Sequence, residues 1–387
     1  MEKKLIVLLL AIILLVHYDP VIAQNDYYNF WQSKVISFNQ KVSNDSQGSP
    51  SVVVAIIDAG IDFSHYDLGY KLKYNNPGEI PNNGVDDDHN GYIDDTYGWD
   101  FVENDNNVTP TLAHIDDNNN GIYDELASHG TSIAGIIAGQ GEDVLGIVPN
   151  IKILDIKVFN SDGGAVDIKK GFDYVYNLSL KDSRIKVINF SGKFAYTSGS
   201  GFNQTLDKLM ANDVTIVASS GNDYNKGEYN VSYPANYPGV ISVGSIDKNE
   251  QISSFSQRGE NLDFVAPGEN VFSLSIGNQI NNNLDGTSFS APFYSAAVAF
   301  IDSFHYKTPL TQTEIFNLLK NSTTDLGSPG WDPIYGYGLL NMTKLVNNIL
   351  PLTIQTTPSL SIGIFSLAIV TIVLIKKSRK INLKSCF

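Results

Sequence analysis

A chain of 387 residues can form one large domain or two ordinary ones, and it can bury a sizeable core without crosslinks. Hydrophobic residues make up 42% of it, which excludes a disordered protein. The formal net charge of −15 excludes nucleic acid as an expected partner, because a phosphate backbone demands a basic surface.

The N-terminus has the pattern of an export signal. Two lysines precede the apolar run Leu5–Val16, which is too short for a comfortable membrane span. Ala23 supplies the small residue of a cleavage site. We therefore predict a signal peptide over residues 1–23, with an uncleaved anchor as the alternative.

The first predicted strand ends on an acid. Val52–Ile57 is an uninterrupted apolar run rich in β-branched residues, as expected of a strand that is buried on both faces of a parallel sheet. Asp58 follows directly. Functional groups collect at the carboxyl ends of such strands, so Asp58 is a candidate site residue.

An acidic insertion follows, at about residues 82–126, and it contains no Lys or Arg between residues 86 and 125. Two segments share a spacing of oxygen ligands at alternate positions with Gly at the sixth, which is the first half of a calcium loop. The predicted ligands are Asp86, Asp88, Asn90 and Asp94 in the first loop and Asp116, Asn118, Asn120 and Asp124 in the second.

The glutamate that usually fills the twelfth place of such a loop is missing, because Tyr97 and Ala127 stand there. Asp95 or Glu125 could substitute. A solvated acidic loop is the alternative. We favour structural calcium, because crowded carboxylates repel one another unless a cation neutralises them.

Strands and helices then alternate. Helical patterns occupy Gly130–Ala138 and Asp167–Leu178. The further strand patterns are Ile151–Val158, Lys186–Phe190, Val214–Ala218 and Val240–Val243. This order predicts an α/β fold, a three-layer α/β/α domain with a mostly parallel central sheet.

Near the C-terminus, an apolar run precedes a basic cluster. The run approaches the length of a membrane span, and basic residues stay on the cytoplasmic side. We predict a transmembrane helix over residues 358–375 and a basic cytoplasmic tail over residues 376–387, with the rest extracellular. A buried core helix is the alternative.

Three polar groups in the middle of the chain suit a nucleophilic relay. Asp58 ends a strand, and His129 and Ser288 open helices. Serine needs a neutral imidazole to take its proton, and the imidazole needs a carboxylate to orient it. The side-chain amide of Asn222 and the backbone N–H of Ser288 could hold the resulting oxyanion. Each group alone is a common cap or turn residue, so their conjunction carries the hypothesis.

At these residues the sequence resembles the subtilisin-like serine proteases, or subtilases, over roughly Trp31 to Val346. The segments that carry the resemblance are Val53–Asp62, His129–Gly135, Asn189–Ser191, Ala218–Asn222 and Gly286–Pro292. Phe289 stands where the family usually has Met, and Lys193 follows Gly192 where a Gly-rich substrate edge is usual.

The resemblance implies a catalytic triad of Asp58, His129 and Ser288, with Asn222 as oxyanion donor. It implies a peptidase domain over residues 24–350 whose own N-terminal helix is Trp31–Val42. The substrate-binding residues that it implies are Ser191, Gly192, Ser219 and Gly221.

We therefore expect a secreted, membrane-anchored serine endopeptidase that cleaves protein or peptide substrates through an acyl-enzyme. We expect a monomer in the cell membrane, single-pass, with the catalytic domain extracellular and with structural calcium. The alternative is a catalytically inactive, calcium-braced cell-surface binding module on the same fold.

Overall fold

The computed structural model describes residues 30–110, 125–141, 143–160, 164–195 and 201–350. One compact unit runs to Val346, and of a second unit, Asn347–Phe387, only residues 347–350 are described. The predicted signal peptide, transmembrane helix, basic tail and second acidic loop lie outside these ranges. Within these ranges, no helix is both long and apolar enough to cross a membrane.

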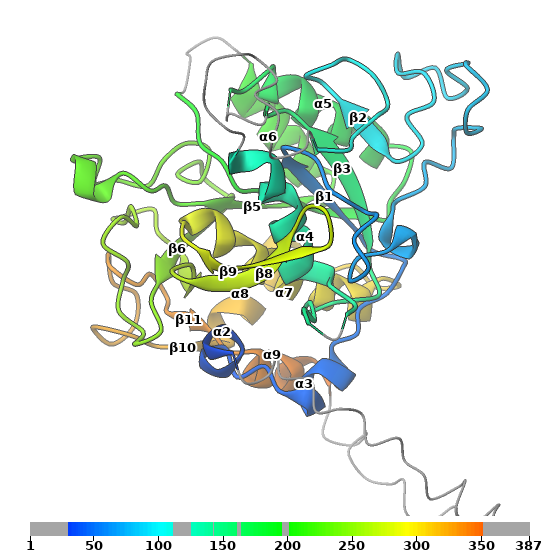
Figure 1. Ribbon diagram of the computed structural model, residues 1–387. Coiled ribbons are helices and arrows are strands. Elements are labelled where there is room, and N and C mark those ends of the chain that lie inside the picture. The colour runs from blue at the N-terminus through cyan, green and yellow to red at the C-terminus, as the bar shows by residue number, and fades with distance from the viewer. Residues whose placement is uncertain (1–29, 111–124, 142, 161–163, 196–200, 351–387) are drawn as a thin grey trace, which may run out of the picture. The chain divides into compact units, whose positions relative to one another are not determined.

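A mostly parallel sheet forms the centre of the first unit (Figure 1). Within the described chain it has nine strands in the order β10-β11-β7-β6-β5-β4-β1-β3-β2, and only the β10–β11 pair is antiparallel. The strands are β1 Val53–Asp58, β2 Gly98–Asp100, β3 Lys152–Lys157, β4 Ile185–Phe190, β5 Thr215–Ser219, β6 Ile241–Ile246, β7 Phe264–Pro267, β10 Thr323–Thr324 and β11 Leu339–Leu340.

Helices cover both faces of this sheet, which confirms the expected three-layer fold (Figure 1). On one face lie α4 His129–Ala138 and α7 Ala291–His305, and on the other α5 Ile168–Ser179 and α6 Phe202–Ala211. The other elements are α2 Trp31–Val35, α3 Gln40–Asp45, α8 Gln312–Asn321, α9 Met342–Ile349, the hairpin strands β8 Val271–Ser275 and β9 Gln279–Leu284, and the 3-10 turns η2 Tyr70–Leu72, η3 Glu125–Ser128, η4 Tyr224–Lys226 and η5 Thr287–Phe289.

The central strand β1 fixes the position of its last residue. All six of its residues are buried, because β3 and β4 pair with its two edges and helices cover its faces. Asp58 therefore ends a rigid strand in the middle of the sheet.

The β8–β9 hairpin braces α4, which begins at His129 (Figure 1). The hydroxyl of Ser132 donates to the carbonyl oxygen of Leu274 at 2.5 Å, and the hydroxyl of Ser273 donates to the carbonyl oxygen of Ser132 at 2.7 Å. Gly135 makes the contact possible, since a Cβ there would lie 2.7 Å from the hydroxyl of Ser273. Gly135, the last residue of the histidine motif, thus lets α4 pack closely against β8.

The single helix expected over Trp31–Val42 is wrong. Two short helices, α2 and α3, take its place. Ser37 between them has φ 56°, in the left-handed region that a helix interior does not tolerate. The side chain of Asn39 accepts the N–H of Val42 at 3.1 Å and so starts α3.

Candidate active site

The buried carboxylate of Asp58, at the end of β1, pairs with the partly exposed imidazole of His129. The Nδ1 atom of His129 lies 2.8 Å from Oδ1 of Asp58 and 3.0 Å from Oδ2. Oδ1 also accepts the N–H of Ala59 at 2.8 Å. Gly130 allows this approach, because a Cβ there would lie 2.4 Å from the carbonyl oxygen of Gly60.

Two opposing effects set the pKa of His129. Burial lowers it, but the charge of Asp58 and the hydrogen bond to that carboxylate more than offset burial, so the pKa is raised above its usual value. A proton on Nδ1 that is donated to Asp58 leaves Nε2 as the basic nitrogen. The pair therefore has the electrostatics of an oriented general base.

Ser288 lies in η5 and shares a cavity with this pair. The cavity has a volume of about 160 Å³, and its walls include Asp58, His129, Ser191, Gly192, Lys193 and Ser288. The hydroxyl of Ser288 donates to the carbonyl oxygen of Ser191 at 3.0 Å, and the hydroxyl of Ser191 donates to the carbonyl oxygen of Ser288 at 2.7 Å. The structure thus brings together the three predicted triad residues and two of the predicted substrate residues.

Asn222 is held by Thr287, the residue before Ser288. Its Oδ1 atom accepts the N–H and the hydroxyl of Thr287, each at 2.8 Å. The position that a Cβ of Gly286 would take is 3.2 Å from Nδ2 of Asn222 and 3.7 Å from the backbone nitrogen of Ser288. The two predicted oxyanion donors therefore border one small space, which a side chain at Gly286 would fill.

Ser219 and Gly221 are not among the residues that line the 160 Å³ cavity. Ser219 is buried at the end of β5. Gly221 has φ 109°, and a Cβ there would lie 2.0 Å from Oε1 of Gln257. Both residues therefore shape the backbone that leads to Asn222, and the side of the cavity is formed by Ser191 and Gly192.

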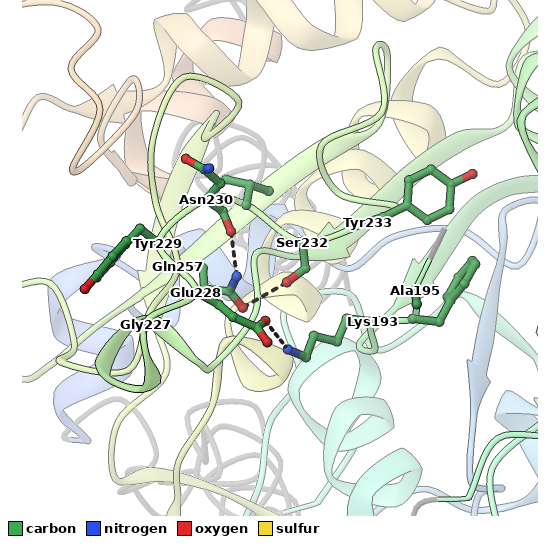
Figure 2. A pocket seen from close by; sticks show the side chains of 11 residues that line it. Lys193, Ala195, Gly227, Glu228, Tyr229, Asn230, Ser232, Tyr233 and Gln257 are labelled. Carbon is green, nitrogen blue, oxygen red and sulfur yellow. Dashed lines mark hydrogen bonds and ion pairs between the residues drawn. The ribbon is translucent and has the colours of Figure 1, made fainter. Parts of the chain in front are cut away.

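A larger cavity, of about 580 Å³, also has Lys193 in its wall (Figure 2). Lys193 lines both cavities. Its ammonium group bonds to the carboxylate of Asp223 and lies 3.0 Å from Oε2 of Glu228, the contact that is dashed in Figure 2. Phe194 and Tyr233 add aromatic surface to this cavity. An ion-paired lysine is thus common to the walls of both cavities.

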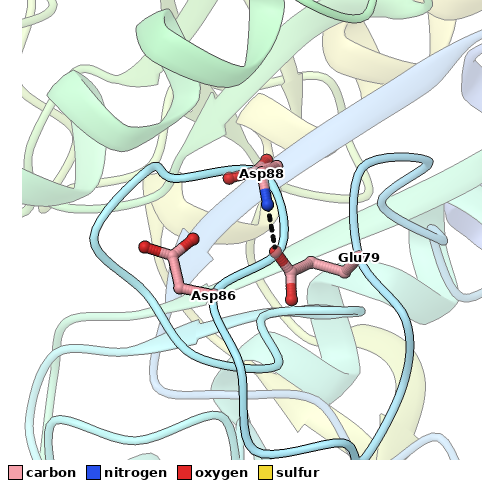
Figure 3. Close-up of side chains that lie close together, drawn as sticks. All are labelled: Glu79, Asp86 and Asp88. Carbon is pink, nitrogen blue, oxygen red and sulfur yellow. Dashed lines mark hydrogen bonds between the residues drawn. The ribbon is translucent and has the colours of Figure 1, made fainter.

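The first acidic loop brings two of its four predicted ligands together with a third carboxylate, Glu79. One oxygen each of Glu79, Asp86 and Asp88 lie within 4.8 Å of one another (Figure 3). This acidic cluster could hold a metal ion. Asn90 and Asp94, the other two predicted ligands of this loop, are not part of the cluster. Oδ1 of Asn90 accepts the N–H of Tyr92 at 2.8 Å. The carboxylate of Asp94 accepts two N–H groups at 2.9 Å each, those of residues 83 and 84.

Comparison with known proteins assigns the chain to a family. The profile of the Subtilase family matches residues 49–338. The chain belongs to the subtilase family. It is 36% identical to subtilisin DY of Bacillus licheniformis over 220 residues, which cover 55% of this chain and 76% of that protein. It is 30% identical to a subtilisin of Bacillus pumilus over 304 residues, 77% of this chain and 92% of that protein. The expected class, a subtilisin-like serine endopeptidase, is confirmed.

Some residues of this subtilase site escaped the sequence reasoning. Thr287 lies in the serine motif, but nothing in the sequence indicates that its hydroxyl donates to Asn222. Asp223 and Glu228 lie 30 and 35 residues beyond Lys193, with no pattern that links them to it. Glu79 precedes the calcium-loop spacing altogether.

Proposed function

We propose that this subtilase hydrolyses peptide bonds through an acyl-enzyme on Ser288. The observation that carries the proposal is the 2.8 Å contact between Asp58 and His129 at the wall of a cavity that also exposes Ser288. The hydroxyl oxygen of Ser288 attacks the peptide carbonyl carbon while Nε2 of His129 takes its proton. His129 then gives this proton to the leaving amine, which departs and leaves the acyl-enzyme. Water attacks the acyl carbon while His129 takes a proton from it, and His129 returns this proton to the oxygen of Ser288 as the carboxylic acid leaves.

The first step requires the hydroxyl of Ser288 to change partner. It donates to the carbonyl oxygen of Ser191 at 3.0 Å, and rotation about its side-chain bond would turn it toward His129. Such contacts tighten only when substrate is bound, so the free geometry is compatible with catalysis. The proposed oxyanion donors are Nδ2 of Asn222 and the backbone N–H of Ser288.

We propose that the substrate passes along Ser191 and Gly192, whose backbone borders the triad cavity. The 580 Å³ cavity lined by Lys193 is then the space for a side chain next to the cleaved bond. Ser219 and Gly221 support this edge through Asn222. The Lys193 ion pairs would make the side-chain preference depend on charge.

Export and membrane anchoring are further parts of the proposal. Residues 1–23 would direct export and residues 358–375 would anchor the enzyme as a single-pass protein, with the peptidase domain, residues 24–350, outside and residues 376–387 in the cytoplasm. The support is the two apolar runs and the basic residues that flank them. We propose a monomer, since the site is built within one chain.

We also propose calcium as a structural ion of the acidic insertion. The support is the ligand spacing together with the acidic cluster of Glu79, Asp86 and Asp88. Calcium would neutralise these carboxylates and stabilise the segment that precedes His129. It would take no part in the bond-making steps, which belong to Asp58, His129 and Ser288.

Labelling by a fluorophosphonate tests the catalytic proposal. The wild-type protein should form a covalent adduct, and Ser288→Ala should form none, because only an activated serine hydroxyl displaces the leaving group of the probe. Both proteins should melt cooperatively at similar temperatures. A folded wild type that takes no label would overturn the proposal and favour an inactive binding module.

A further inference from the structure

The acidic cluster contains a carboxylate that the loop spacing does not predict. We infer that Glu79, from outside the repeat, completes a calcium site with Asp86 and Asp88. This inference rests on the proposed binding of calcium by the insertion, and it deepens that proposal by naming the ligands of one site. Glu79 would take the role that the loop leaves open at its twelfth position, where Tyr97 stands.

The burial of Glu79 is the first independent observation. Glu79 is only 6% exposed. Its Oε1 atom accepts the N–H of Asp88 at 3.1 Å. Its Oε2 atom is buried and has no hydrogen-bond partner among the described residues. A buried carboxylate oxygen without a partner is costly, and a bound cation would remove that cost.

Asp88 repeats this pattern beside Glu79. Its side chain is 5% exposed, and its Oδ1 atom accepts no hydrogen bond from the described residues. The nearest cation is the ammonium group of Lys181, 3.5 Å from Oδ1, on a side chain that is half exposed. One lysine beside three carboxylates leaves the cluster negatively charged, so Lys181 does not replace a divalent ion.

The backbone holds the three carboxylates in place. A turn of residues 76–79 carries Glu79, and Gly78 lets this turn pack on Asp88, since a Cβ at Gly78 would lie 2.6 Å from Cβ of Asp88. The carboxylate of Asp86 accepts the N–H groups of Asn90 at 3.0 Å and Gly91 at 2.8 Å. The ligands are therefore positioned by two separate turns before any ion arrives.

The spacing of the oxygens fits calcium. One oxygen of each carboxylate lies within 4.8 Å of the others. Two oxygens bound to one Ca²⁺ at about 2.3–2.6 Å can be up to about 5 Å apart. Calcium also accepts irregular coordination completed by water and carbonyl oxygens, which suits a site on two loops. Figure 3 shows the carboxylates of Glu79 and Asp86 directed into the space beside Asp88.

Calcium titration of the full-length protein tests the inference, with Ser288→Ala as the background so that self-digestion cannot interfere. Calorimetry would give the number and affinity of sites after chelation, and the melting temperature would be recorded with and without Ca²⁺. Glu79→Gln keeps the shape of the side chain but removes its charge. We expect it to lose one site or weaken it by about tenfold or more.

Glu103→Gln is the matched control, because Glu103 is an exposed glutamate of the same insertion. It should bind calcium as the background protein does. Asp86→Asn should lose the same site as Glu79→Gln, and the double variant should lose no further site. Should Glu79→Gln not fold, Glu79→Asp gives the comparison, because it keeps the charge but withdraws the carboxylate by one methylene, and it should weaken the same site.

The outcomes separate the two proposals. No calcium binding by the background protein would overturn the proposed role of calcium itself. Calcium binding that is unchanged in Glu79→Gln, in number and affinity, would overturn the assignment of Glu79 while leaving the insertion a calcium-binding segment. Neither result depends on peptidase activity.

Discussion

Thr287 binds the side-chain oxygen of Asn222 twice, through its backbone N–H and through its hydroxyl, at 2.8 Å each. The same hydroxyl accepts the N–H of Gly221 at 3.1 Å. Because these bonds use Oδ1 of Asn222 as an acceptor, they fix the orientation of the side-chain amide and leave its Nδ2 group to donate elsewhere. The residue before the proposed nucleophile thus acts as a positioning residue for the proposed oxyanion donor.

Replacing Thr287 should weaken catalysis through Asn222. Loss of an oxyanion donor lowers kcat by about 10²–10³ in this class of enzyme, so we expect that loss for Asn222→Ala. Thr287→Val should lower kcat by a smaller factor with little change in KM, and Thr287→Ser should retain activity. In the Asn222→Ala background, Thr287→Val should add little. Additive losses would contradict this coupling.

The His129–Asp58 pair predicts a change in pH dependence. His129 must be unprotonated to act as base, so kcat/KM should rise with pH through a pKa that Asp58 holds above its usual value. Asp58→Asn should lower kcat on the order of 10⁴-fold. It should also move the acid limb of the residual activity to lower pH, because burial alone lowers the pKa of His129. An acid limb that stays in place would count against the pair.

Lys193 should control the side-chain preference of the enzyme. Lys193→Ala leaves Glu228, in the wall of the 580 Å³ cavity, without its ion pair to Lys193, and it leaves Asp223 with Lys226 alone. We expect the ratio of kcat/KM for a lysine substrate over a matched leucine substrate to rise by about tenfold. Lys226→Ala is the control, because Lys226 also pairs with Asp223, at 2.7 Å, but does not line the cavity. Equal ratios in both variants would contradict the prediction.

Asp302 should make stability depend on pH. Burial raises its pKa to about 7, and its Oδ2 atom has no hydrogen-bond partner among the described residues. Ionisation of Asp302 therefore costs free energy in the folded state, so its contribution to stability falls as pH rises from about 4 to about 7. Asp302→Asn should match the parent protein at pH 4 and exceed it at pH 8, by up to a few kcal/mol.

Thermal melting of both proteins across this range, in the Ser288→Ala background, gives the measurement for Asp302. The sign of the difference follows from a folded-state pKa above the unfolded value of 3.8. A difference in melting temperature that is constant from pH 4 to pH 8 would show that ionisation of Asp302 is not its cause.

Local sequence patterns predicted the strands and helices that carry the site residues. They did not predict the contacts between segments that are distant in the sequence. A strand that is buried on both faces has a continuous apolar sequence, so β1 and the placement of Asp58 at its end could be predicted. The break between α2 and α3 depends on the left-handed backbone of Ser37. A serine, unlike a glycine, does not indicate such a backbone in the sequence. The approach of Glu79 to Asp88 depends on how two loops pack, which no spacing rule records.

The position of Asp58 in the middle of the sheet has a consequence for when the site can form. His129 is 71 residues from Asp58, and Ser288 bonds to a residue 97 positions before it. Such contacts cannot form before the later of the two residues has been synthesised. A ribosome that has not yet completed α7 therefore carries a chain with no assembled triad. The order of the three residues along the chain thus delays assembly of the triad until most of the polypeptide has been synthesised.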